Sequence, residues 1–396
     1  MKTEAVLKEN AGKEAADKPR MYFIDNLRGM MIILVVMIHI NVTYSGIGGW
    51  YYVEQDSGRL DIFSKVFCGL FGMFLQAFFM GILFFIAGYF VPGSFDRKGA
   101  IRFIKERFIR LGIPAAVYMF VINPFILYFL LGIYRKGSAE TALSVSYIRY
   151  IQSGDFLGGS GPMWFALALL VFSILYSAAR LAGARPGSSR KTVISSKMIL
   201  GLILLVTGVT FLVRLYFPFG TDIFNMQLCF FTQYIVLFIA GITAYRKRFF
   251  ESLTYRFGTR WMKYGVSLGM LFWIIIIVAG GALSGNEKAL FGGLKWQSAG
   301  YSFWESLICA SMSLGLLAVF REKYNKHNRL SKFISDNAFG VYAFHPPLLI
   351  FISISLRNVT VYPVLKILLV GIITLPVVFI FSYLIRKVPG VGKLYS

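Results

Sequence analysis

An arginine and a histidine stand eleven residues apart in the first long apolar stretch of the chain, at Arg28 and His39. At 3.6 residues per helical turn, this spacing places their side chains about 20° apart on one face and roughly 16 Å apart along the axis. The residues between them, 29–38, carry no polar side chain, so the stretch is predicted to cross a membrane. Arg28 then lies at the membrane edge and His39 near the bilayer midplane, where an ionisable group is expensive and usually functional.

His39 is the candidate catalytic residue. A neutral imidazole can take a proton from a hydroxyl near physiological pH, or it can accept an acyl group and pass it on. The alternative is a histidine that only packs helices together through a hydrogen bond to a neighbouring group. We favour the catalytic interpretation because an ionisable residue inside a membrane is functional by default.

Arginines near the same membrane edge are candidate ligands for phosphate. Arg28 has Asp25 one turn before it, so it is either an orientation anchor with a local ion pair or a guanidinium that holds a phosphate-bearing ligand. Arg107 and Arg110 lie one turn apart in the densest basic stretch, residues 97–114. That stretch is either an amphipathic linker on anionic lipid or a paired-arginine clamp for phosphate.

A second membrane histidine, His345, is followed by Pro346 and Pro347. Two prolines are expected to break the helix inside the membrane and to free backbone carbonyls. Tyr342 precedes this histidine by three residues. His327, the third histidine of the chain, lies in a basic loop and is expected to be solvated.

Trp164 follows Gly161-Pro-Met at the start of another apolar stretch. A tryptophan there is most often an interfacial belt residue and less often a stacking platform for a sugar.

Composition predicts a membrane protein. Of the 396 residues, 57% are hydrophobic and 15% are charged, whereas a soluble domain carries about 25% charged residues. The predicted fold is an all-α, polytopic transmembrane helix bundle, with residues 1–20 as a polar tail and 21–396 as a single membrane domain. Ten spans of sufficient length are expected near residues 29–47, 66–91, 111–133, 162–179, 198–217, 228–245, 264–282, 303–320, 338–356 and 363–385.

The basic residues set the expected orientation. With the N-terminus in the cytoplasm, 30 of the 41 Lys and Arg fall in inner segments and only eight in outer loops, so both termini are predicted to be cytoplasmic. This topology explains most of the net charge of +23, and binding to nucleic acid is not needed. The three cysteines have no CxxC spacing, so neither a disulfide nor a metal site is predicted.

Several of these motifs resemble the acyltransferase-3 family of integral membrane acyltransferases, which modify sugars, glycans and lipids in bacteria. The opening Arg28-x10-His39 and the pair Arg107-x-x-Arg110 look like that family's most specific motifs. Weaker likenesses are Phe84-Phe-Ile-Ala-Gly88-Tyr89, Pro162-Met-Trp164-Phe165 and Phe339-Gly-Val-Tyr342-Ala-Phe-His345-Pro346.

The resemblance implies an acyl-CoA donor, most often acetyl-CoA, that enters from the cytoplasm as a substrate rather than as a tightly bound cofactor. It implies a hydroxyl acceptor on a carbohydrate or lipid at the outer side or in the bilayer. The expected location is the bacterial cytoplasmic membrane. On this interpretation Arg28, Arg107 and Arg110 bind the donor, His39 is catalytic, and Asp25, Trp164, Tyr342 and His345 line the site.

The alternative function is a secondary transporter or exporter of a glycan or lipid-linked substrate. Proline-interrupted helices suit alternating access, and His39 and His345 would then relay protons. Against it, the spans show no clear acidic coupling residue, since Glu305 is expected near a span end.

Overall fold

The computed structural model describes residues 20–54, 57–132, 147–184 and 193–395. Within these ranges, ten helices are long and apolar enough to cross a membrane, so the predicted span count and all-α class are confirmed. Residues 1–19 of the expected polar tail, 133–146 of an expected outer loop and 185–192 of an inner connection lie outside the described residues.

Nine of the spans are built around single long α-helices. These are α2 (Tyr22–Ser45), α3 (Ile62–Lys98), α8 (Trp164–Leu181), α9 (Ser196–Tyr216), α10 (Phe231–Arg246), α12 (Tyr255–Ala279), α13 (Trp296–Lys323), α14 (Arg329–Ser355) and α15 (Pro363–Lys387). A short helix α11 (Phe249–Ser252) joins α10 to α12, and a hairpin of β1 (Asp222–Ile223) and β2 (Met226–Gln227) follows α9.

The third span, Ala100–Leu130, is the irregular one. It contains α4 (Ala100–Arg107) and α5 (Ile113–Val117), with π-helical segments at Phe108–Gly112, Tyr118–Ile122 and Phe125–Leu130. Only Gly99, with φ of 73°, separates this span from α3. The basic stretch is therefore mostly the first turns of a helix that continues into the third span.

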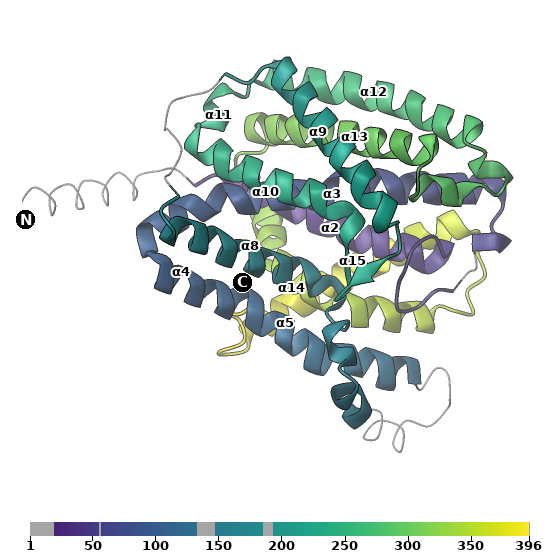
Figure 1. The fold of residues 1–396 in the computed structure, drawn as a ribbon. Coiled ribbons are helices and arrows are strands. Elements are labelled where there is room, and N and C mark those ends of the chain that lie inside the picture. Colours follow the sequence, from purple (N-terminus) through teal and green to yellow (C-terminus); the bar gives the residue numbers. More distant parts are fainter. Residues whose placement is uncertain (1–19, 55–56, 133–146, 185–192, 396) are drawn as a thin grey trace, which may run out of the picture.

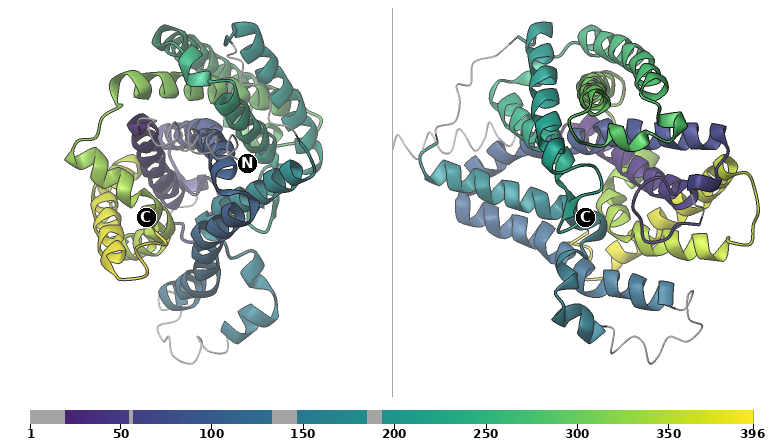
Figure 2. Two further views of the ribbon diagram at one scale, coloured as in Figure 1. Left: turned by 90° about the vertical axis from the view of Figure 1, so that its left-hand side faces the viewer. Right: turned by 45° about the vertical axis from the view of Figure 1, so that its right-hand side comes forward.

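The helix α2 occupies the middle of the bundle, where it contacts α3, α13, α14 and α15. Helices α3 and α10, α12 and α13, and α14 and α15 pack as pairs around it. Figure 1 shows α12 and α13 on one side of α2 and α3, with α4, α5 and α8 on the other. The end-on view in Figure 2 shows α2 with α14 and α15 beside it. The central helix thus carries Arg28 and His39.

The expected break at the two prolines of the ninth span is wrong. Helix α14 continues from Arg329 to Ser355 with Pro346 and Pro347 inside it. A proline costs a helix one N–H···O bond and crowds the preceding turn, but neighbouring groups can satisfy the freed carbonyl inside a bundle.

A buried ion pair joins α9 to α13. Arg214 Nη2 donates to Glu305 Oε2 at 2.7 Å, and the two side chains are 0% and 2% exposed. Glu305 therefore lies inside the bundle rather than near a span end, but its carboxylate is neutralised by a fixed partner. Removing one partner of such a pair leaves an uncompensated buried charge, so we assign this pair a structural role.

Two glycines allow α3 and α10 to approach closely. A Cβ atom on Gly88 would lie 2.1 Å from the Phe238 carbonyl oxygen, and one on Gly241 would lie 2.1 Å from the Phe85 carbonyl oxygen. Both obstacles are backbone atoms, which cannot rotate away. Small residues at such crossings are typical of membrane helix packing, where close backbone contact replaces hydrophobic driving force.

We therefore expect the Gly241→Ala substitution to lower the thermal unfolding midpoint of the detergent-purified protein. Forcing a methyl group into a packed crossing typically costs about 1–3 kcal/mol. Gly201→Ala is the control, because a Cβ atom at Gly201 meets no atom within 4 Å. Equal midpoints for the two variants would contradict the close approach of α3 and α10.

Candidate active site

A cavity of about 1080 Å³ lies beside the last three turns of α2. On α2 it is lined by Val35, Ile38, His39 and Val42. Its rim includes exposed residues of the connecting segments, among them Asp155 and Asp222. The cavity is thus at the end of the bundle where α2 finishes, which the basic-residue distribution predicts to be the outer side.

The two membrane histidines meet at the floor of this cavity. His39 Nδ1 lies 3.0 Å from His345 Nε2, and the two rings are stacked with centroids 5.0 Å apart. His39 is half-buried and lines the cavity, whereas His345 is fully buried behind it. Residues from the first and ninth spans therefore form one histidine pair.

The proline after His345 explains how this ring is held. Pro346 has no N–H to donate to the carbonyl of Tyr342, four residues earlier. His345 Nδ1 lies 2.9 Å from that Tyr342 oxygen and 3.2 Å from the Val341 oxygen. The imidazole therefore takes the place of the missing backbone donor and satisfies the Tyr342 carbonyl.

These contacts fix the tautomers of both neutral rings. A carbonyl oxygen only accepts, so His345 Nδ1 must carry hydrogen, and its Nε2 is then the acceptor. His39 Nδ1 must donate to that acceptor, so Nε2 of His39 keeps its lone pair. A histidine whose one nitrogen is held as a donor presents its other nitrogen as a base or nucleophile.

Trp50 covers the face of the His39 ring. The two rings are stacked with centroids 3.9 Å apart, and the Trp50 ring is nearly parallel to that of His345 as well. Trp50 reaches this position because the segment after α2 turns back into the bundle. Gly46 and Gly48 adopt φ of 64° and 120° there, conformations that favour glycine.

A polar network lines the cavity next to Trp50. The Tyr51 hydroxyl donates to Asn123 Oδ1 at 2.7 Å, and Asn123 Nδ2 donates to the Tyr150 hydroxyl at 2.9 Å. Burial raises the pKa of Tyr51 and of Tyr150, so both remain neutral hydroxyls at physiological pH. Asn123 lies between two π-helical segments, which often mark functional sites.

The other two predicted lining residues also reach the cavity. Trp164 lies along its wall and stacks on Tyr234, with ring centroids 5.6 Å apart. Tyr342 is buried, lines the cavity and donates its hydroxyl hydrogen to the Pro162 carbonyl. Trp164 therefore belongs to an internal aromatic wall and not to a lipid-facing belt.

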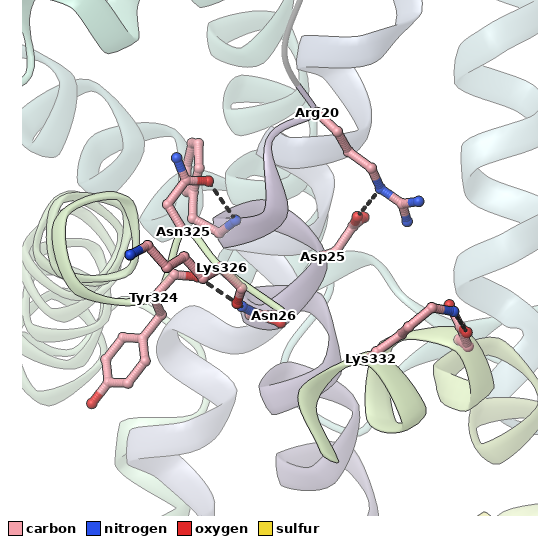
Figure 3. A network of polar contacts seen from close by, with 9 residues as sticks. Arg20, Asp25, Asn26, Tyr324, Asn325, Lys326 and Lys332 are labelled. Atoms are coloured by element: carbon pink, nitrogen blue, oxygen red, sulfur yellow. Dashed lines mark hydrogen bonds and ion pairs between the residues drawn. The ribbon is translucent and has the colours of Figure 1, made fainter. Parts of the chain in front are cut away.

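Asp25, in contrast, lies far from the cavity. It accepts a hydrogen bond from Arg20 Nε at 2.9 Å in the first turn of α2, as Figure 3 shows. Asp25 forms its ion pair with Arg20. Arg28 makes no such close contact with Asp25, although the two charges are near enough to attract each other.

The three predicted arginines gather at the end of the bundle opposite to the cavity. Arg28, Arg107 and Arg110 are close enough for their charges to interact. Arg28 is exposed, and within the described ranges neither Arg28 nor Arg107 makes an ion pair shorter than 4 Å. Three guanidinium groups held together in this way suit a multiply charged phosphate ligand.

None of these three arginines lines the cavity that contains His39. Its deepest lining residue on α2 is Val35, and Met31 and Ile32 between Val35 and Arg28 are buried. His39 stands six residues before the end of α2, roughly 9 Å from it, and is about as far from that end as from the middle of the helix. Arg28 and His39 do share one face of α2, as their spacing predicts, but the residues between them on that face are buried.

Comparison with protein families identifies the chain. The model of the acyltransferase-3 family, described as an acyltransferase domain, matches residues 21–383. The chain belongs to the acyltransferase-3 family. Its ten apolar helices and its family together indicate an integral membrane protein.

Curated relatives include the glucans biosynthesis protein C of Escherichia coli strains K12, O1:K1 / APEC and O9:H4. Each is 30% identical to this acyltransferase-3 chain over 159 residues, which cover 39% of this chain and 38% of the relative. The match thus spans well under half of the relatives' length. No solved structure matches the chain.

Sequence reasoning missed several residues of this acyltransferase-3 site, most of all Trp50 and the network of Tyr51, Asn123 and Tyr150. The run Gly46-Ile-Gly-Gly-Trp50 was a usable signal, because clustered glycines permit a tight return of the chain. The hydrogen bond between His39 and His345 joins residues that are 306 positions apart in the sequence. The only indication of it in the sequence was the proline that follows His345.

The deduced tautomers can be checked by ¹⁵N NMR of histidine-labelled protein in lipid. Because the chain has only three histidines, a His327→Gln variant leaves the signals of His39 and His345 alone. Both rings are expected to carry hydrogen on Nδ1 and none on Nε2 when neutral. A protonated Nε2 on neutral His39 would contradict the hydrogen-bond assignment.

Proposed function

We propose that this protein transfers an acyl group, acetyl in the simplest case, from acyl-CoA to a hydroxyl group of a glycan. The donor binds at Arg28, Arg107 and Arg110, on the side predicted to be cytoplasmic. The acceptor binds in the cavity at His39, on the side predicted to be outer. The expected location is the bacterial cytoplasmic membrane, with both termini inside.

The observation that carries the proposal is the position of the paired histidines at the floor of this cavity. His39 Nε2 takes the proton of the acceptor hydroxyl while its Nδ1 donates to His345 Nε2. The positive charge that forms on His39 is thus shared with a hydrogen-bond acceptor that is already in place. General-base catalysis of this kind contributes typically about 10²–10⁴-fold.

Two routes use the same residues. In the direct route, the acceptor oxygen attacks the thioester carbonyl, the C–S bond breaks, and coenzyme A leaves as a thiolate that needs little acid assistance because a thiol pKa is near 8.5. In the covalent route, His39 Nε2 attacks the thioester carbonyl, the C–S bond breaks and coenzyme A leaves as a thiolate. The acceptor oxygen then attacks the acyl carbonyl, the C–N bond breaks, and the hydroxyl proton passes to the released Nε2.

Charge supports the assignment of the two substrates to opposite ends. Among the described residues that line the cavity there is no Lys or Arg, and Asp155 and Asp222 stand at its rim. Coenzyme A carries several negative charges and would be repelled there. The arginine cluster has the opposite sign and the exposed Arg28, so it suits the donor.

The cavity wall suits a neutral carbohydrate. Its lining contains both aromatic rings and amide or carboxylate groups. Aromatic rings stack on the apolar face of a sugar, and amide and carboxylate groups form hydrogen bonds with its hydroxyls. The lining residues of these two kinds are Trp50, Tyr51, Tyr128, Tyr150, Trp164, Tyr234, Gln76, Asn123, Asp155, Asp222, Asn225 and Gln227. The printed name of the relatives, glucans biosynthesis protein C, favours a glucan as the first acceptor to test.

Replacing His39 with Ala is expected to abolish release of coenzyme A thiol when acetyl-CoA and a glucan oligosaccharide are supplied. His345→Ala is expected to lower kcat by about 10²-fold or more with little change in the KM for acetyl-CoA, since the arginine cluster remains intact. Native-like thermal unfolding of both variants is the control. Wild-type kcat in a folded His39→Ala variant would remove this residue from the mechanism.

Replacing Arg107 or Arg110 with Gln is expected to raise the KM for acetyl-CoA by about tenfold or more, the loss typical of a hydrogen bond to a charged group. Arg102→Gln is the matched control, because Arg102 lies in the same helix but is paired with Glu106 at 3.2 Å. Steady-state kinetics with varied acetyl-CoA measures both. Equal KM values in all three variants would place the donor elsewhere.

A further inference from the structure

A second cavity, of about 520 Å³, lies at the end of the bundle that is predicted to be cytoplasmic. It is formed where α13 ends, α14 begins, and both meet the first turns of α2. Its lining consists of basic and polar residues and of apolar residues, namely Lys323, Tyr324, Lys326, His327, Asn328, Ser331 and Asn26, and then Met30, Ile33, Phe320 and Ile334.

The segment between α13 and α14 is held against α2 by hydrogen bonds. Asn26 Nδ2 donates to the carbonyl oxygens of Tyr324 and Lys326 at 2.7 and 3.0 Å. The Phe23 N–H donates to Asn325 Oδ1 at 3.2 Å. Figure 3 shows these contacts around the first turns of α2. The polar wall of the cavity is therefore a fixed structure that joins three helices.

This wall is positively charged. Lys323 and Lys326 are exposed and line the cavity, and no Asp or Glu does so within the described part of the chain. Glu322, which precedes Lys323 in the chain, does not line the cavity. Asp25 and Asp336 are paired with Arg20 and Lys332. The N-terminus of the 27-residue α14 adds the positive end of a helix dipole.

His327 adds a donor or acceptor that has no partner. We expected this residue to be solvated, but it is partly buried against the Tyr22 ring, and its Nε2 atom is buried without a hydrogen-bond partner. A buried polar atom left unsatisfied is costly. Its place in the lining, between the two lysines and the start of α14, suits a ligand oxygen.

The apolar part of the lining lies deeper along the helices. Met30 and Ile33 follow Asn26 by four and seven residues, roughly 6 and 10 Å along α2. Ile334 follows Ser331 by almost one turn on α14 in the same direction. The cavity is thus basic at the helix ends and apolar farther into the membrane, which is the polarity of a phospholipid standing in its leaflet.

The cavity is separate from the site of the proposed acyl transfer. Asn26 and Arg28 are two residues apart, which places their side chains about 160° apart around α2. Met30 and Ile33 share the face of Asn26, whereas His39 shares the face of Arg28. A donor bound in this cavity would have α2 between its thioester and His39.

We propose that this cavity binds an anionic phospholipid of the adjacent leaflet, with its phosphate at Lys323, Lys326 and His327 and one acyl chain along Met30, Ile33 and Ile334. Basic pockets between membrane helices on the cytoplasmic side bind such head groups. The bound lipid bridges α2, α13 and α14, and so supports the helix that carries Arg28 and His39.

Native mass spectrometry of the full chain in detergent tests this proposal with phosphatidylglycerol and, separately, phosphatidylcholine. The Lys323→Gln/Lys326→Gln variant is expected to lose affinity for phosphatidylglycerol by roughly fivefold for each lysine. Lys323→Arg/Lys326→Arg should retain it. Lys197→Gln is the matched control, because Lys197 is exposed at the same end of the bundle but does not line the cavity.

Equal retention of phosphatidylglycerol by the wild type and the double Gln variant would overturn the proposal. So would equal binding of the two lipids, or displacement of phosphatidylglycerol by free coenzyme A or by inorganic phosphate at matched concentration. The readout is lipid retention and not acyl transfer, so failure here leaves the proposed enzymatic function unaffected, and the converse also holds.

Discussion

The candidate site depends on one chain of hydrogen-bonding groups, from the Tyr342 carbonyl through His345 to His39. Inside a membrane bundle no bulk water satisfies a free carbonyl, so each buried polar group needs a protein partner. Pro346 removes the ordinary partner of Tyr342, and the His345 ring takes its place. Once His345 is held in this way, only one neutral tautomer of His39 is compatible with their contact. The missing backbone N–H of Pro346 in α14 therefore determines which nitrogen of His39, on α2, keeps its lone pair.

The distribution of charge complements this arrangement. Arg28, Arg107 and Arg110 lie at one end of the bundle, and the described lining of the large cavity at the other end holds carboxylates and no Lys or Arg. Under the proposed function, an anionic donor is attracted to the arginine end and repelled by the carboxylates at the other end, which leaves the large cavity to a neutral acceptor. Arg28 and His39 are separated by roughly 16 Å of helix, so only a donor with a long flexible arm brings its reactive group from one to the other.

The sequence predicted the features that depend on local pattern. Ten apolar stretches, the shared face of Arg28 and His39, and the grouping of Arg28 with the Arg107–Arg110 pair all follow from helix geometry and from the distribution of charge. The sequence did not predict the features that depend on contacts between segments far apart in the chain. Trp50 covers His39 because a glycine-rich segment folds back. The pairing of Glu305 with Arg214 depends on the contact of α9 with α13, and α14 remains unbroken because His345 compensates for Pro346.

The packed layer between the cavity and the arginines has a physical reason under the proposed function. An enzyme whose donor and acceptor come from opposite sides must not leave a continuous aqueous passage, because ions would cross the membrane through it. Met31 and Ile32 on α2 are buried and close the route below Val35, while Trp50 covers the His39 ring from the loop that follows α2. Of the two cavities described, His39 lines the one at the predicted outer end.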